Sequence, residues 1–281
     1  MNVLSLFDGI SCGQIALNRL GIKYDNYYAS EIDKSAIKVT QYNFPNTIQL
    51  GDIRNVHAKD LPKIDLILAG SPCQDLSQGN NNRQGLKGAK SGLFFEFARL
   101  LKECKPKYFL LENVVMALEN NLIITSNVGV YPVAINSKLL SAQSRDRLYW
   151  TNIPGDDITL FGNQISQPKD KGISLQSILD HGYTDMEKSR CILATGGGIG
   201  YKNMDLLYRR YSEIGFVNIV FDSPDFNYKK GIRNLSQNEI EQLQTLPKGY
   251  TKILTKPKEY YSAIGNGWTI DVICHILKNI K

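Results

Sequence analysis

Short runs of β-favouring residues alternate with amphipathic stretches over the first 150 residues, and this alternation restricts the chain to the α/β class. Leu93, Phe97 and Leu100 recur at the spacing of a core-facing helix over 92–102. Further helices are expected over 13–20 and 34–43. The pattern predicts a parallel sheet flanked by helices. Its strands are expected at 3–7, 27–30, 47–50, 64–69, 108–111, 130–136 and 148–151.

The texture of the sequence changes near residue 155, where short segments rich in Gly, Asn, Asp and Ser begin. No helix of convincing length is expected there. Helix signals begin again after 233. Ser236 and Glu239 form a capping-box pattern, and a last helix is expected over 269–280. We therefore predict three segments: a sheet domain over 1–154, a small domain over 155–232, and a segment over 233–281 that returns to the sheet domain.

Composition narrows the class of protein. No apolar run reaches the roughly 18 residues of a membrane helix, and the N-terminus lacks the charged start of a secretory signal. We therefore expect an intracellular, cytoplasmic protein that does not contact a membrane. The chain has five cysteines and no CxxC pair, which predicts neither a disulfide framework nor a metal cluster. One cysteine is free to be chemically active.

The net charge of +6 is compatible with an anionic partner without requiring one. Between Arg83 and Lys107 there are seven Lys or Arg residues against two Glu. A charge run of this kind is more often a solvated helix face than a phosphate-binding surface, and both interpretations stay open at this point.

The first expected strand leads through FDGISCG into a helix, so Gly9 and Gly13 lie at a strand-to-helix turn. The pattern GxGxxG is absent, and a purely structural turn is the alternative. Glu31 closes the second strand, where a carboxylate can accept both ribose hydroxyls of an adenosine. Asp52 closes the third strand and can accept from an adenine amino group. Three successive strand ends with these groups favour a nucleotide-like ligand.

Cys73 follows the fourth strand in GSPCQ, at the sheet edge where open α/β folds bind ligands. A free cysteine is usually inert core. The polar neighbours of Cys73 and the Gly-rich run over 77–92 make burial of Cys73 unfavourable, so we interpret it as a nucleophile. Glu112 closes the fifth strand, and a thiolate with a carboxyl group in one cleft forms an addition and proton-transfer pair.

Polar side chains alternate at period two in Gln143, Arg145 and Arg147. If this segment is extended, the three share one face, and two guanidinium groups can hold a phosphate or a base carbonyl. A surface strand is the alternative.

Taken in order, FDGISCG, GSPCQ, ENV, QSRDR, RNLSQNEIEQLQTLP and AIGNGWT resemble the motifs of cytosine-C5 DNA methyltransferases. The stretches SPCQDLS, GLFFEFARLL and LLENVV are similar to the Dnmt3-like catalytic domain of bacterial or phage type. The match covers 2–152 and 233–281. It implies a Rossmann-like seven-stranded methyltransferase sheet with a small inserted target-recognition domain at 155–232.

The resemblance also implies a cofactor, S-adenosyl-L-methionine, and a set of residues around it. The loop that lines the cofactor would comprise Phe7, Asp8, Gly9, Ile10, Ser11 and Gly13. Its ribose would lie at Glu31 and its adenine at Asp52 and Ile53, and Ile32 would also contact the cofactor. The residues that close the pocket would be Pro72, Leu93, Asn266 and Trp268. The last motif reads Gly-Asn-Gly-Trp, which departs from the usual Gly-Asn-Ser, so the roles of Asn266 and Trp268 rest on a weaker match.

On the same basis, Cys73 would add to C6 of a cytosine flipped out of double-stranded DNA, and Glu112 would bind its N3 and amino group. Arg145 would orient the base, assisted by Gln143 and Arg147. The loop after Cys73 would contact DNA through Gln78, Arg83, Lys87 and Lys90. Two alternatives remain: a tRNA cytosine-5 methyltransferase, although the Cys-Phe-Thr tag of that branch is absent, and a catalytically silent DNA-binding homologue.

Three further expectations follow from the resemblance. The activity would belong to a restriction-modification system or a phage. A monomer and a weak homodimer are equally open. Because the first motif starts at residue 3, we expect no N-terminal chromatin-reading modules of the kind that animal relatives carry.

Overall fold

The computed structural model describes residues 1–72, 91–159, 162–195, 203–215 and 217–280. Packing divides the chain into two compact units. Unit 1 comprises Met1–Ile135, Asp146–Gln167 and Cys274–Lys281, and unit 2 comprises Asn136–Arg145 and Pro168–Ile273. Most of the segment 233–281 thus packs within unit 2. This division rests on packing alone, and the functional partition into 1–154, 155–232 and 233–281 stays a prediction.

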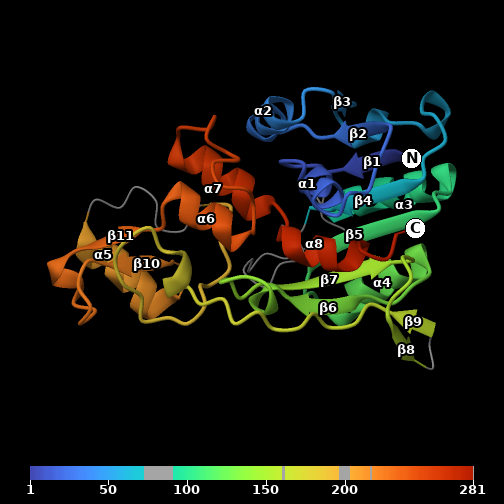
Figure 1. The fold of residues 1–281 in the computed structure, drawn as a ribbon. Coiled ribbons are helices and arrows are strands. Elements are labelled where there is room, and N and C mark those ends of the chain that lie inside the picture. Colours follow the sequence, from blue (N-terminus) through green and yellow to red (C-terminus); the bar gives the residue numbers. More distant parts are fainter. Residues whose placement is uncertain (73–90, 160–161, 196–202, 216, 281) are drawn as a thin grey trace. The chain divides into compact units, whose positions relative to one another are not determined.

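Unit 1 contains a seven-stranded sheet in the order β3-β2-β1-β4-β5-β7-β6 (Figure 1). Each of the seven expected strands is present, within a few residues of its expected bounds, and the α/β class is confirmed. The bounds are β1 Asn2–Leu6, β2 Asn26–Ser30, β3 Ile48–Gln49, β4 Leu66–Gly70, β5 Tyr108–Val114, β6 Val133–Asn136 and β7 Asp146–Thr151.

The expectation of a wholly parallel sheet is wrong for β7, which pairs antiparallel with β5. The reason lies in the connection between β6 and β7. A parallel neighbour requires a crossover of a dozen or more residues, usually a helix. Residues 137–145 are fewer than that, and their helical part is the single 3₁₀ turn Ser137–Leu139. The chain therefore turns back, and the sheet is mixed.

The described residues of unit 1 include the helices α1 Cys12–Arg19, α2 Lys34–Asn43, α3 Phe94–Cys104 and α4 Leu118–Val128. The first three match their expected positions. Buried residues of α3 and α4, among them Phe94, Phe97 and Ile124, pack with Leu111 and Trp150 of the sheet into one apolar core. Helix α1 packs closely against the strands at Gly13, where a Cβ atom would lie 2.6 Å from a side-chain carbon of Leu68.

Helix α4 was not expected, because LENNLIITSNV is rich in asparagine and β-branched residues with low helix propensity. Tertiary contacts stabilise it instead. Ile124 is fully buried, and Thr125 accepts a hydrogen bond from the indole of Trp150.

Unit 2 contains two helices that the sequence did not predict, α5 Met204–Arg209 and α7 Pro257–Asn266. Helix α6, Gln237–Leu243, begins with the expected capping box of Ser236 and Glu239. Two strands, β10 Ile219–Phe221 and β11 Ile232–Asn234, form an antiparallel pair. Ile219 and Phe221 of β10 belong to a small apolar cluster, whose other buried members are Leu207, Tyr211 and Val217.

The remaining elements are short. Strands β8 Asp157–Thr159 and β9 Gly162–Gln164 form a hairpin in unit 1. Helix α8, Ile270–Leu277, is the expected last helix, and the division between the units falls within it. Single 3₁₀ turns occur at Ile53–Asn55, Ala58–Asp60, Ser91–Leu93, Gln176–Ile178 and Tyr228–Lys230, and a π-helical turn at Arg210–Ile214 follows α5. Within the described ranges, every helix is too short or too polar to span a membrane.

Candidate active site

The turn between β1 and α1 has an unusual backbone. Phe7, Gly9 and Ser11 all have positive φ, at 56°, 59° and 59°. Non-glycine residues rarely adopt this region, and such strain is found where the surrounding structure enforces it, often at functional sites. At Gly9 the same φ carries no steric penalty. The strained backbone therefore makes the carboxyl end of β1 a candidate functional site.

Glu31 fastens this turn to the end of β2. One oxygen of its carboxylate accepts a hydrogen bond from the Gly9 N–H at 2.8 Å. The other accepts from the N–H groups of Ile32 and Asp33 at 2.7 and 2.8 Å. Because a carboxylate has about four lone-pair sites, Glu31 retains capacity for a hydroxyl donor. The side chain of Ile32 beside it is 68% exposed.

The end of β3 is joined to β2 by the hydroxyl of Ser30, which donates to the Gly51 carbonyl at 2.7 Å. Asp52 follows and begins the 3₁₀ turn at Ile53. Hydrogen bonds from the side chain and backbone of Arg54 lower the pKa of Asp52 to about 2. The carboxylate that was expected at an adenine amino group is therefore charged and engaged by Arg54. Ile53 is buried in the core of unit 1.

Asp8 lies beneath the β1–α1 turn and is almost fully buried. Its two carboxylate oxygens accept from the hydroxyls of Ser11 at 2.6 Å and Tyr27 at 2.9 Å. Burial raises the pKa of Asp8 to about 6, against the lowering effect of its hydroxyl donors. Asp8 was expected to line the cofactor loop. The structure shows it supporting that loop from below.

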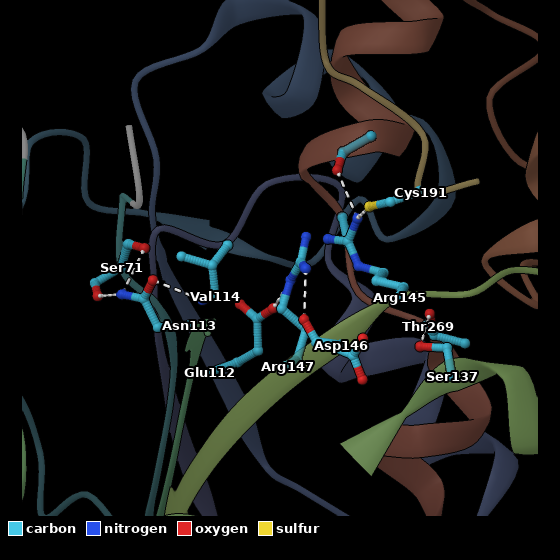
Figure 2. A network of polar contacts seen from close by, with 12 residues as sticks. Ser71, Glu112, Asn113, Val114, Ser137, Arg145, Asp146, Arg147, Cys191 and Thr269 are labelled. Atoms are coloured by element: carbon cyan, nitrogen blue, oxygen red, sulfur yellow. Dashed lines mark hydrogen bonds and ion pairs between the residues drawn. The ribbon is translucent and has the colours of Figure 1, made fainter. Parts of the chain in front are cut away.

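Glu112 lies within β5, which continues to Val114 instead of ending at residue 111. Glu112 is opposite Gly70 of β4 on one side and Tyr149 of β7 on the other. Arg147 lies two residues before Tyr149 and so on the same face, diagonal to Glu112. Its Nε atom forms an ion pair with the Glu112 carboxylate at 2.9 Å, as Figure 2 shows. The two side chains are only 14% and 10% exposed.

Asn113 is a residue whose role sequence reasoning missed. Its buried amide donates to the hydroxyl of Ser71 at 2.8 Å and to the Ser71 carbonyl at 3.4 Å (Figure 2). This bond ties the segment after β4 to β5, two residues before Cys73. Its sequence signal is the position of an amide directly after Glu112.

Several expected residues can be placed only in part. Pro72 is half-buried after β4, and Leu93 is half-buried against the core of unit 1. Ile10 is buried in the β1–α1 turn. The expected nucleophile and the expected DNA contacts lie outside the described residues: Cys73, Gln78, Arg83, Lys87 and Lys90. Within the described parts of the chain, no three His, Cys, Asp or Glu side chains are grouped to hold a metal ion.

The sequence predicts that Gln143, Arg145 and Arg147 share one face if the segment is extended, but of the three only Arg147 lies in a strand. Strand β7 begins only at Asp146, so the two residues upstream lie outside it. Arg145 is buried in unit 2, where its guanidinium donates to the carbonyls of Gly265 at 3.3 Å and Gly267 at 3.0 Å. It also contacts the sulfur of Cys191, as Figure 2 shows.

Gln143 is likewise buried in unit 2. Its amide donates to the Leu243 carbonyl and the Gln244 side chain, and it accepts from the Ile192 N–H at 2.8 Å. The turn held by Arg145 presents Asn266 as an exposed residue and buries most of Trp268.

The family model for C-5 cytosine-specific DNA methylases matches residues 1–189 and 164–281. The orphan methyltransferase M.SPRI of Bacillus phage SPR is 34% identical over 169 residues, which cover 56% of this chain and 38% of that protein. This chain thus aligns with well under half of that phage relative.

Two further comparisons span the chain. The type II methyltransferase M.Bsp6I of Bacillus sp. (strain RFL6) is 28% identical over 320 residues, covering 100% of this chain and 98% of that protein. The crystal structure of S. pombe Dnmt2 methyltransferase has a TM-score of 0.67 at 18% identity, covering 99% of this chain and 97% of that chain, which shows a shared fold. Because the family model accounts for both ends of the chain, the chain belongs to the C-5 cytosine-specific DNA methylase family.

Proposed function

We propose that the chain is a DNA (cytosine-5-)-methyltransferase that methylates C5 of a flipped-out cytosine in a double-stranded recognition sequence. One observation carries the proposal. Glu112, whose carboxylate forms an ion pair with Arg147, lies opposite Gly70 in the sheet, and Gly70 is three residues before Cys73. An acid is thereby held on the strand next to the one that leads to the expected nucleophile. Membership of the family supports the same reaction.

The ends of the first three strands fit S-adenosyl-L-methionine. The spare lone pair of Glu31 suits a ribose hydroxyl, and the exposed side chain of Ile32 offers an apolar surface to an adenine. The positive φ of Gly9 lets the backbone turn at the end of β1 with open space where a Cβ atom would lie, and Gly13 lets α1 pack closely on the sheet. When bound, the cofactor would supply an electrophilic methyl group.

The chain's own residues would activate the base. The Cys73 thiolate adds to C6, which places the electron pair of the C5–C6 double bond at C5. Glu112 accepts from the exocyclic amino group and donates a proton to N3, which neutralises the negative charge that this addition creates on the ring. Once C5 carries the methyl group, C5 loses its proton, the double bond re-forms and the C6–sulfur bond breaks.

Arg147 and Arg145 would have different roles. We assign to Arg147 the task of holding the Glu112 carboxylate, because their ion pair is nearly buried. Arg145 and Gln143 would instead hold the turn of Asn266 and Trp268, which was expected to close the cofactor pocket. We therefore assign to Arg147 the role of orienting the base that the resemblance implied for Arg145.

DNA binding would depend on the loop that contains Gln78, Arg83, Lys87 and Lys90. Cytosine C6 is inaccessible in a stacked duplex, so the base must leave the helix, and phosphate contacts by this loop would support that step. A DNA substrate would place the enzyme in the cytoplasm of a bacterial cell or phage-infected host. The similar proteins are named as orphan and type II methyltransferases, so the mark would be made with or without a partner endonuclease.

Bisulfite sequencing tests the proposal. Plasmid DNA without cytosine methylation is incubated with S-adenosylmethionine and the native protein, Cys73→Ser or Cys104→Ser. Cys104 is half-buried at the end of α3 and serves as a matched control. We expect protection at one recurring sequence with the native protein and Cys104→Ser, and none with Cys73→Ser. Absence of protection with the native protein would overturn the proposal, and methylation of tRNA in a parallel reaction would then identify the substrate as RNA.

A further inference from the structure

A continuous chain of buried hydrogen bonds runs beneath the β1–α1 turn and is centred on Gln14. The Gln14 amide donates to the Ser11 hydroxyl at 2.9 Å and to the Thr47 hydroxyl at 2.7 Å. Its carbonyl accepts from the Tyr24 hydroxyl at 3.0 Å. Ser11 in turn donates to Asp8. Of these residues only Tyr24 is half-exposed; the other four are buried.

The direction of this chain is fixed by the Asp8 carboxylate. A serine hydroxyl has one proton, so donation by Ser11 to Asp8 leaves its oxygen only as an acceptor. The group facing Ser11 from Gln14 must therefore be the NH₂ end, whose second proton serves Thr47. A buried amide with all three contacts satisfied holds its neighbours in one arrangement, because rotating it would leave buried donors unpaired.

Gln14 joins two segments that the sheet does not join directly. Strands β1 and β3 are separated by β2, so no backbone ladder connects the turn after β1 with the segment of β3. Thr47 immediately precedes β3, whose carboxyl end leads to Asp52. Ser11 belongs to the strained turn after β1. The Gln14 side chain therefore sets the spacing between the turn and the strand that leads to Asp52.

We propose that Gln14 is a positioning residue for the cofactor, acting through Ser11 and Thr47 on the two segments that would hold S-adenosylmethionine. The inference rests on the proposed function. Gln14 does not reach the reacting atoms, so its loss weakens cofactor binding and leaves the methyl-transfer step unchanged once cofactor saturates. In kinetic terms KM for the cofactor rises while kcat stays constant.

The test compares Gln14→Leu, Thr47→Val and Thr47→Ser with the native protein. Calorimetric titration gives Kd for S-adenosylmethionine, and initial rates against cofactor concentration give KM and kcat. We expect Kd and KM to rise about tenfold in Gln14→Leu, the equivalent of one lost hydrogen bond, and several-fold in Thr47→Val. Thr47→Ser keeps the hydroxyl and should restore native values. A merely structural role would not produce this rescue with constant kcat.

Two results would overturn the inference: native Kd in both Gln14→Leu and Thr47→Val, or a fall in kcat with unchanged KM. Thr47→Val is nearly isosteric, so it keeps the test decisive if Gln14→Leu fails to fold. A native protein that does not bind S-adenosylmethionine would instead overturn the proposed function. A native protein that binds, with variants that bind equally well, overturns only the role of Gln14.

Discussion

The ion pair between Glu112 and Arg147 gives a prediction whose size can be worked from the structure. At 2.9 Å, and with an effective dielectric constant of about 20, the attraction is roughly 6 kcal/mol before desolvation is subtracted. Desolvation cancels much of this, but removing one partner leaves a nearly buried charge, at a cost of about 3–5 kcal/mol. We therefore expect Arg147→Met to lower the free energy of unfolding of unit 1 by about 3 kcal/mol.

The double variant Arg147→Met/Glu112→Gln isolates the interaction. It removes both charges, so it should be more stable than the sum of the single losses implies, with a coupling of about 2 kcal/mol. Lys278→Met is the matched control. Its ion pair with Asp156 has a similar length, 2.8 Å, but side chains 36% and 38% exposed, so its loss should cost less than about 1 kcal/mol.

Tryptophan fluorescence during denaturant unfolding can report unit 1 alone. The chain has two tryptophans, Trp150 in β7 of unit 1 and Trp268 in unit 2. In a Trp268→Phe background the signal comes from Trp150, which is fully buried three residues from Arg147. A coupling below about 0.5 kcal/mol would refute the reasoning, since additivity at that level is what independent sites show.

Three further predictions concern other buried groups. Because burial raises the pKa of Asp8 from 3.8 to about 6, Asp8 ionises near pH 4 in the unfolded chain but only near pH 6 in the folded protein, so a rise in pH through this window weakens the fold. The free energy of unfolding should fall by about 3 kcal/mol over this window, and Asp8→Asn should abolish that slope in denaturant titrations at pH 4 and pH 7. Asn113→Ala removes the bond to Ser71 and should reduce kcat about tenfold by displacing the segment before Cys73, so an unchanged kcat would contradict this role. Glu239 is fully buried against Arg233 and the α6 N-terminus, so Glu239→Gln should destabilise unit 2 by about 3 kcal/mol. A fall in melting temperature of under about 2 °C would argue against this prediction.

The positions of the strands were predictable from sequence because each is a short apolar run between turn residues. The direction of β7 was not, because direction depends on the length and path of residues 137–145. Helix α4 was missed for a related reason. Its sequence has weak helix propensity, and the packing of Ile124 and the Trp150 contact that stabilise it come from distant parts of the chain.

For the site, the residues at strand ends were predictable, but their partners were not. The link from Glu31 to the Gly9 N–H joins residues that come just after two neighbouring parallel strands, so it follows from the geometry of the sheet. The separate partners of Arg145 and Arg147 do not, since period-two spacing places side chains on one face but cannot say where the strand begins. The buried position of Asp8 likewise depends on Tyr27, which no local pattern connects with it.

The antiparallel pairing of β7 has a consequence for how the sequence can evolve. Loops at the ends of parallel strands tolerate insertions, because added residues leave the strands in register. Arg147 does not lie in such a loop. It lies inside β7, where it pairs with Val114 of β5. One residue inserted between Arg147 and Trp150 would turn either the arginine or the indole to the opposite face of the sheet. Their three-residue spacing is therefore a fixed length in a protein whose loops are free to vary.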